Sequence, residues 1–340
     1  MNKHVRTMQR VRSLLLRPPV AVCFAGLLVI GASCTSSDGS PSAEPSDRSG
    51  GQIVFVRSGQ DDTQTFFLAD ADGSGERQLT APGEYCCLLR ISPDRSGLLV
   101  MPTELSPPIT GGVLSIDGER FEPFALPDPS LNLVPQAWSP DGTRIAFEGW
   151  DDTDPGRTGV YTARASDLGG LVRVTTGIGK RHDIPLDYSP DGTQLVIYRS
   201  VRAEPNFPID TGGSLWVVDV DGSNTHRLET PGTTPAWWAR WSPDGTKILF
   251  ATERLQPTGA LWTIEPDGSD LTKVFEDAEG RFATGPIWSP DGSQILFTLN
   301  PTNDSFVHEP NGFYVVDADG NNLTLVIGGS GFKSSPEWWQ

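Results

Sequence analysis

The residue types that could carry out catalysis are few in this 340-residue chain, and they do not form a recognised catalytic pattern. A serine hydrolase needs its nucleophile within Gly-x-Ser-x-Gly, on a turn between a strand and a helix. The closest segment, Gly328-Gly329-Ser330-Gly331-Phe332, has Phe332 where that motif has its last glycine. We therefore expect no serine-hydrolase site and no catalytic residues.

A histidine metal site is equally unsupported. Beyond residue 34 the histidines are His182, His226 and His308, in three separate segments, and neither His-x-x-x-His nor Cys-x-x-Cys occurs. Close spacings of that kind bring two ligands to one metal ion. We expect no metal site and no cofactor, and we place His226, which follows a turn, at the surface.

Repeated Asp-x-Asp-Gly segments, such as Asp70-Ala71-Asp72-Gly73, suggest calcium binding at first sight. An EF-hand loop needs three spaced acidic ligands before its glycine and a glutamate at its end. Here the glycine comes too early and no glutamate follows at the right distance. We interpret these segments as β-turns, while a calcium ion held by carboxylates in a central channel stays an open alternative.

Two adjacent cysteines, Cys86 and Cys87, lie in a segment that we expect to be a strand. In an oxidising compartment they could form a vicinal disulfide. Adjacent residues of a regular strand point to opposite faces, so such a bond would distort the strand. The alternative is two buried thiols that act as small hydrophobic side chains, and both interpretations stay open.

The dominant feature of the chain is a repeated turn that must position all of these residues. An aromatic or apolar residue followed by Ser-Pro-Asp occurs five times, and the aspartates are 47, 50, 53 and 47 residues apart. The copies begin at Ile91, Trp138, Tyr188, Trp241 and Trp288. Proline fixes φ, aspartate bonds back to the backbone, and the glycine that follows in four copies accepts a positive φ. The motif therefore predicts a hairpin turn between two strands.

A second turn, containing Asp-Gly or a degenerate form of it, occurs six times. The copies are residues 70–73, 116–118, 167–170, 219–222, 266–268 and 317–320. An apolar run such as 214–218 precedes each copy, and a short strand follows. Each repeat thus contains four short strands, which is one propeller blade.

The ends of the repeated region fit the same pattern. Residues 51–56 match the strand that follows Ser-Pro-Asp-Gly, and residues 336–338 match the strand that precedes it. The last strand should complete the first blade, which removes open sheet edges. We predict an all-β fold over residues 51–340: a six-bladed β-propeller of four-stranded blades, closed by the C-terminal strand joining the first blade.

The Trp-Ser-Pro-Asp-Gly…Ile-x-Phe…Asp-x-Asp-Gly pattern resembles the TolB-type six-bladed propeller, a WD-repeat-like family, over nearly all of residues 51–340. The resemblance implies an interaction platform in the cell envelope. Propellers host many unrelated activities, so the fold by itself does not fix the function. TolB proteins carry an α/β domain before the propeller, and this chain has no matching segment, which argues against a role in the Tol system.

The first 33 residues predict export. Five basic residues and no acidic one precede a mostly apolar run over 20–33. A basic segment followed by an apolar run too short to span a bilayer easily is typical of a signal peptide. An ordinary secretory signal and an uncleaved membrane anchor are alternatives to a lipoprotein signal.

The segment Gly31-Ala32-Ser33-Cys34 resembles the lipobox of bacterial lipoproteins, although Gly31 stands where leucine is commoner. In that family the chain is cut before the cysteine, which then carries lipid. Residues 34–50 are rich in Ser, Pro and Gly, which predicts a disordered, flexible tether. We predict lipidation at Cys34 and attachment to the outer face of the cytoplasmic membrane or to another envelope membrane.

The net charge of the whole chain is −17, and removal of the first 33 residues makes it −22. Such a surface repels phosphate backbones and anionic lipid head groups. We expect no nucleic-acid partner, contact with the membrane through the lipid anchor only, and a monomeric single domain.

One residue of each repeat, directly before the aromatic residue of the turn, should line the channel. These residues are Arg90, Ala137, Asp187, Arg240, Ile287 and Glu337. The two arginines and two acids could recognise a ligand. We favour the alternative, that they pair with one another or with the turn aspartates.

Both repeated turns should lie on one face of the disc and the longer, irregular loops on the other. Function gathers on variable loops that a rigid scaffold holds, and tryptophan beside arginine is typical of interface hot spots. Sugar binding and inter-blade packing use the same residue types, and packing is our preferred interpretation for Trp237-Trp238. The predicted partner-binding residues are Trp150, Arg181, His182, Trp237, Trp238, Arg281 and Phe282.

We predict a non-catalytic, envelope-anchored platform that binds an envelope protein or peptide on its loop face. The alternatives are a sugar-active lyase or lactonase at the channel mouth and a glycan-binding module. Convergence of carboxylates and His182 in one funnel would favour the enzyme.

Overall fold

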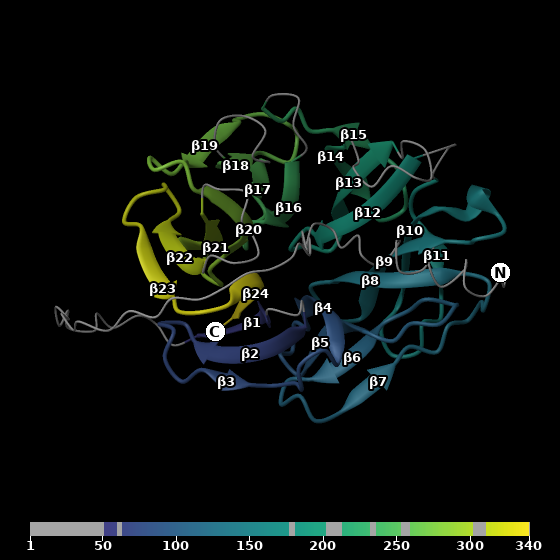
Figure 1. Cartoon of the computed structure of the whole chain (residues 1–340). Coiled ribbons are helices and arrows are strands. Elements are labelled where there is room, and N and C mark those ends of the chain that lie inside the picture. The colour runs from purple at the N-terminus through teal and green to yellow at the C-terminus, as the bar shows by residue number, and fades with distance from the viewer. Residues whose placement is uncertain are drawn as a thin grey trace, which may run out of the picture.

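The computed structural model describes residues 51–59, 63–176, 181–201, 213–231, 236–252, 259–301 and 311–339, without the side chains of residues 88, 89, 181, 201 and 237. Within these residues, twenty-four strands form six four-stranded sheets arranged as a ring (Figure 1). The predicted all-β propeller is confirmed. The predicted signal peptide, Cys34 and the tether lie outside the described residues, as does His308.

Each blade is an antiparallel sheet whose strands follow one another along the chain, except in the first blade. Blade 1 comprises β24 (Phe332–Trp339), β1 (Gln52–Ser58), β2 (Gln64–Asp70) and β3 (Arg77–Gln78). Blade 2 comprises β4 (Tyr85–Ile91), β5 (Gly97–Pro102), β6 (Gly112–Ser115) and β7 (Phe121–Pro123). Blade 3 comprises β8 (Asn132–Trp138), β9 (Arg144–Trp150), β10 (Gly159–Arg164) and β11 (Val172–Arg173).

The remaining blades repeat this order from the channel outward. Blade 4 comprises β12 (Arg181–Tyr188), β13 (Gln194–Val201), β14 (Ser214–Asp219) and β15 (His226–Arg227). Blade 5 comprises β16 (Ala236–Trp241), β17 (Ile248–Thr252), β18 (Leu261–Ile264) and β19 (Thr272–Phe275). Blade 6 comprises β20 (Phe282–Trp288), β21 (Gln294–Asn300), β22 (Gly312–Asp317) and β23 (Thr324–Ile327).

The C-terminal strand closes the ring as predicted. β24 pairs with β1, with Trp338 opposite Ile53 and Trp339 opposite Gln52. The six innermost strands contact one another in turn: β4 with β8, β8 with β12, β12 with β16, β16 with β20, β20 with β24, and β24 with β4 (Figure 1). No blade therefore has an inner strand without a neighbour on each side.

Six apolar cores fill the spaces between neighbouring blades. The core between blades 6 and 1, for example, contains Ile53, Phe55, Leu296 and Phe313, all fully buried. Trp338 packs against this core, whereas Trp339 belongs to the core between blades 1 and 2. The last strand thus stabilises two interfaces at once, which links closure of the ring to burial of its apolar surface.

The Ser-Pro-Asp turns are fixed by hydrogen bonds within six residues of chain. In the second copy, Ser139 Oγ donates to Asp141 Oδ1 over 2.6 Å, and the amides of Thr143 and Arg144 donate to Asp141 Oδ1 and Ser139 Oγ over 3.0 and 2.9 Å. The bonds that Asp141 accepts, from Ser139 first and then from Thr143, lower the pKa of Asp141. The same three bonds recur in the other four copies.

In four of the six second turns, those with Gly73, Gly118, Gly222 and Gly320, the neighbouring blade requires the glycine as well as its own φ. Gly320 of blade 6 has a φ of +84°, and a Cβ there would lie 1.8 Å from the carbonyl oxygen of Val274 in blade 5. Gly118 of blade 2 is equivalent, with a Cβ that would lie 2.2 Å from Leu79 O of blade 1. These turns therefore also lock one blade against the next.

The two faces of the ring follow from the antiparallel order. The Ser-Pro-Asp turns and the second turns share one side, the turn face. Connections between second and third strands and between blades share the other side, the loop face, which includes residues 103–111, 124–131, 151–158, 276–281 and 328–331. Within the described residues, no helix is long and apolar enough to cross a membrane.

Candidate functional site

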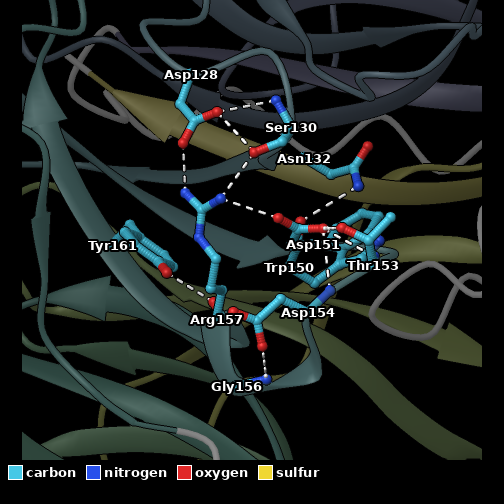
Figure 2. A network of polar contacts seen from close by, with 10 residues as sticks. All are labelled: Asp128, Ser130, Asn132, Trp150, Asp151, Thr153, Asp154, Gly156, Arg157 and Tyr161. Atoms are coloured by element: carbon cyan, nitrogen blue, oxygen red, sulfur yellow. Dashed lines mark hydrogen bonds and ion pairs between the residues drawn. The ribbon is translucent and has the colours of Figure 1, made fainter.

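A charged network organises the loop face at blade 3, between strand β9 and the connection that enters β8 (Figure 2). Arg157 Nη1 donates to Asp151 Oδ2 over 2.9 Å and to Ser130 Oγ over 2.7 Å, and Nη2 donates to Asp128. Thr153 holds Asp151 through its amide and its hydroxyl, at 2.8 and 2.7 Å. One arginine thus fastens two separate connections together.

Both carboxylates of this network are held in the ionised form. Hydrogen bonds from Ser130 first, and then from Arg157, lower the pKa of Asp128 to about 2. Those from Thr153 lower the pKa of Asp151 to about 2. The loop around them is ordered by the 3-10 turn η1 (Pro155–Arg157), which Asp154 caps by accepting from the Gly156 amide (Figure 2). The arrangement is a hydrogen-bonded, ionised surface.

His182 lies on this face but belongs to a polar contact between blades. Its Nε2 is 2.7 Å from Glu148 Oε1, so β12 is joined to β9. Next to it, Asp183 is 1% exposed and accepts two bonds from Arg199, at 2.7 and 2.8 Å. The Arg199 guanidinium lies 4.6 Å from the centre of the Trp216 ring. These contacts fix the loop-face end of blade 4.

The other predicted partner-binding residues lie at different depths. Trp150, at the end of β9, is half-buried against the core between blades 2 and 3. Trp238 packs against the cores on both sides of blade 5, in agreement with the packing interpretation, and has a φ of +53°. Phe282 is 8% exposed. Arg181 and Trp237 lie on the described backbone, at the start of β12 and in β16, but their side chains lie outside the described set.

Arg281 is at the surface but is engaged by its own loop. Its Nη2 and Nε donate to the two carboxylate oxygens of Asp277, at 2.8 and 3.1 Å, and its guanidinium lies 5.7 Å from the Tyr314 ring centre. Asp277 is 6% exposed. Arg281 therefore shapes the loop before β20 as well as contributing charge to the face.

The predicted column of charged residues does converge, at the turn-face end of the channel. Arg240 Nη2 donates to Glu337 Oε1 over 2.7 Å, and Arg90 Nη1 lies 3.6 Å from the same oxygen. Both arginines also donate to the carbonyl oxygen of Leu186. Asp187 accepts from the Trp241 amide over 3.0 Å. The expectation that these charges pair with one another is confirmed.

This charged cluster lines a cavity of about 270 Å³ together with tryptophans that precede the turns, Trp138, Trp241, Trp288 and Trp338. Burial raises the pKa of Asp187 to about 7, against the attraction of Arg90. Burial likewise raises the pKa of Glu337 to about 7. The two carboxyls thus titrate near neutral pH rather than near their ordinary pKa values of 3.8 and 4.5.

The channel carboxyls and His182 do not share one funnel. His182 is near the start of β12 and Asp187 near its end, five residues along an extended strand, which corresponds to roughly 16 Å. Among the described residues, no three His, Cys, Asp or Glu side chains are grouped so as to hold a metal ion.

The serine segment considered above forms the loop between β23 and β24. The fully buried Lys333 donates through Nζ to carbonyl oxygens of this loop, including those of Gly329 at 3.0 Å and Gly331 at 3.2 Å. Ser330 therefore lies in a lysine-held loop that leads into a strand. The strand-to-helix turn that activates a hydrolase nucleophile is a different setting.

The TolB beta propeller domain family matches residues 50–340. The chain belongs to this family. An uncharacterized protein of Agrobacterium fabrum, Atu1656, is 28% identical over 211 residues, which is 59% of this chain and 64% of that protein. This chain thus aligns with a little less than two thirds of that relative.

Solved structures agree with the fold. TolB from Acinetobacter baumannii superposes with a TM-score of 0.63 at 17% identity, over 85% of this chain and 67% of that one. A putative TolB from Agrobacterium tumefaciens gives 0.57 at 20% identity, over 84% and 92%. An oligogalacturonate lyase from Vibrio parahaemolyticus gives 0.54 at 14% identity, over 82% and 80%. At these identities the likeness establishes the TolB-type propeller architecture.

Proposed function

We propose that this protein is a non-catalytic platform of the cell envelope that binds a protein or peptide on its loop face. The observation that carries the proposal is the Arg157 network, which joins two irregular connections into one rigid, ionised surface. Rigid loops bind with a smaller entropy loss than loops that must become ordered. Trp150 at the end of β9 and Arg181 at the start of β12, both at the loop-face ends of their strands, are the residues that we assign to the partner.

The binding face can be tested with two charge-matched double variants. On the loop face, Arg181→Glu is combined with Glu279→Lys, whose side chain is 76% exposed. On the turn face, Arg77→Glu is combined with Glu119→Lys, both at exposed positions. Each pair leaves the net charge of −17 unchanged. Arg281 is left intact because its substitution would leave the buried Asp277 without its arginine.

The full-length protein, in detergent, would first be used to capture a partner from solubilised envelopes. Surface plasmon resonance at low and high salt would then compare both variants with the wild type. We expect the loop-face variant to associate more slowly, chiefly at low salt, because surface charges act mainly on the association rate. Equal losses in both variants, or a loss in the turn-face variant alone, would contradict the assignment.

We also propose that Cys34 carries the lipid that holds the protein at the membrane. A single acyl chain binds only marginally, so stable anchoring needs two or more chains. Cys34→Ala should leave the precursor uncleaved or the protein released from the membrane fraction. A variant that fractionates and migrates like the wild type would refute lipidation at this residue.

The enzymatic alternative is a sugar-active lyase or lactonase, and the similarity to an oligogalacturonate lyase is the observation in its favour. It would use the channel carboxyls, whose raised pKa values suit proton transfer near neutral pH. Ultraviolet absorbance of unsaturated products, measured during incubation with oligogalacturonate, tests it directly. Turnover lost in Glu337→Gln would favour this alternative over the platform, and a glycan-binding module would bind the same sugars without turnover.

A further inference from the structure

The adjacent cysteines on β4 are closer than a regular strand would place them. Cys86 Sγ and Cys87 Sγ are 3.3 Å apart, and Cys86 Sγ lies 3.6 Å from the carbonyl oxygen of Pro102 on β5. Neither residue is joined in a disulfide, and both are half-buried. A thiol pair at this separation is in contact and can exchange a proton.

A local irregularity of β4 explains the contact. Tyr85 pairs with Pro102 and Cys87 pairs with Met101, so Cys86 is an extra residue without an opposite partner on β5. An extra residue of this kind is a β-bulge, which bends the strand and redirects its side chains. The expectation that adjacent side chains must point to opposite faces does not hold here. The strand already departs from the regular geometry that a vicinal disulfide would have distorted.

The pair is placed near the loop face. β4 begins there, directly after the connection from blade 1, and both cysteines are half-buried against the apolar core between blades 2 and 3. A hydrogen bond from the Cys87 thiol lowers the pKa of Cys86. The thiolate is the form that attacks disulfides. Cys86 is therefore the better nucleophile for the first attack, and Cys87 makes the second.

We propose that Cys86 and Cys87 are a redox modification site that closes reversibly into a vicinal disulfide by exchange with a disulfide oxidant, such as oxidised glutathione or an oxidised thiol–disulfide oxidoreductase. The Cys86 thiolate attacks the oxidant, a mixed disulfide forms, and one thiolate of the oxidant leaves. The Cys87 thiolate then attacks Cys86 Sγ, the new S–S bond forms, and the second thiolate leaves. Two protons are released from the protein, and its two electrons pass to the oxidant.

The full-length chain allows a direct test. The protein is equilibrated in glutathione buffers from fully reduced to fully oxidised, quenched with acid, alkylated with N-ethylmaleimide and digested with trypsin. Cleavage after Arg77 and Arg90 gives a peptide that contains Cys86 and Cys87 and neither Cys23 nor Cys34. Mass spectrometry of this peptide therefore reports on the pair alone.

We expect two alkyl groups on the reduced peptide. In oxidising buffer we expect none, together with a mass loss of two hydrogen atoms that dithiothreitol reverses. The single variants Cys86→Ser and Cys87→Ser control for access, because each remaining thiol should stop as a mixed disulfide with glutathione. A wild-type peptide that stays fully alkylated, or that accumulates glutathione on one cysteine without closing, would overturn the proposal.

Discussion

The two faces of this propeller are stabilised by different kinds of contact. On the turn face, Ser139 and Asp141 bond to each other and to amides within six residues, and four further copies repeat the pattern. On the loop face, several bonds join distant segments: Arg157 to Asp128, 29 residues away, and Lys333 to Asn311, 22 residues away. The Ser-Pro-Asp turns are therefore encoded locally and repeatedly, whereas each of these long-range loop-face contacts is encoded once. A surface that differs from blade to blade is the one able to recognise a specific partner.

Closure of the ring underlies both faces, so its loss should have the largest effect. Deletion of residues 336–340 removes Trp338 and Trp339 from two inter-blade cores and exposes part of β1. Truncation of a single buried tryptophan to alanine costs about 3–5 kcal/mol. We expect aggregation, which size-exclusion chromatography would detect, or a large fall in melting temperature, which thermal unfolding would measure. Removal of residue 340 alone is the control, and an unchanged melt after the longer deletion would contradict the closure.

The contribution of the turn face to blade packing can be isolated with a matched pair of glycines. Gly320 and Gly268 have nearly equal φ values, +84° and +89°, but a Cβ at Gly268 would meet nothing within 4 Å. Gly268→Ala should cost roughly 1–2 kcal/mol for the left-handed backbone. Gly320→Ala should cost about 1–3 kcal/mol more, because its Cβ overlaps Val274 O. Urea unfolding measures both, and equal losses would mean that the approach of blade 5 is not a constraint.

The stability contributed by Asp187 and Glu337, at the channel end of the turn face, should depend on pH in the opposite sense to that contributed by the aspartates of the Ser-Pro-Asp turns. Burial raises the pKa of Asp187 and Glu337, so the folded state binds more protons than the unfolded state between their ordinary values and about 7. The contribution of these two carboxyls to the free energy of unfolding is present at low pH and is lost as the pH rises through that window.

Unfolding free energies at pH 5 and pH 7.5 would check this dependence. Relative to the double variant Asp187→Asn/Glu337→Gln, the wild type should lose up to a few kcal/mol of unfolding free energy between the lower and the higher pH. Asp141→Asn is the control. The pKa of Asp141 is lowered, so its contribution is lost only below its ordinary value of 3.8 and should not change over this range. A free-energy difference between wild type and double variant that is the same at both pH values would mean that Arg90 and Arg240 keep both carboxyls ionised.

Loss of Arg157 on the loop face should lower the stability of the protein more than loss of an exposed ion pair on the turn face. Arg157→Gln leaves Asp151, whose side chain is 5% exposed, without its arginine. Arg164→Gln breaks a pair with Asp167 in which both side chains are more than half exposed. We expect a clear fall in melting temperature for the first variant and little change for the second, because exposed pairs contribute little. The first variant should also weaken partner binding, so equal melts and equal affinities would remove Arg157 from its proposed role.

The same contrast explains what could be predicted from the sequence. The five Ser-Pro-Asp turns, the six second turns and the matching end segments were enough for the blade count, the closing strand and the two faces, since each turn depends only on nearby residues. The pairing of Arg90, Arg240 and Glu337 could be anticipated because the repeat places them in equivalent positions. The Arg157 network could not, because Asp128 and Arg157 belong to connections with no repeat. The bulge at Cys86 was also missed, since the sequence does not show which residue lacks an opposite partner.

The smallest expected effect comes from the one Ser-Pro-Asp turn that departs from the repeat. Arg95 occupies the position of Gly142 with nearly the same φ, +64° against +69°. A non-glycine residue in this conformation costs about 1–2 kcal/mol, and the greater unfolded-state entropy of glycine offsets roughly 0.5–1 kcal/mol of that. Arg95→Gly should therefore stabilise the protein by roughly 0.5–1 kcal/mol, measured by urea unfolding. Gly142→Arg should have the opposite effect, because a Cβ there would come no closer than 3.9 Å to Pro93 and only the backbone term changes. If both substitutions destabilise, the first turn holds its arginine through side-chain contacts, and the five turns are not interchangeable.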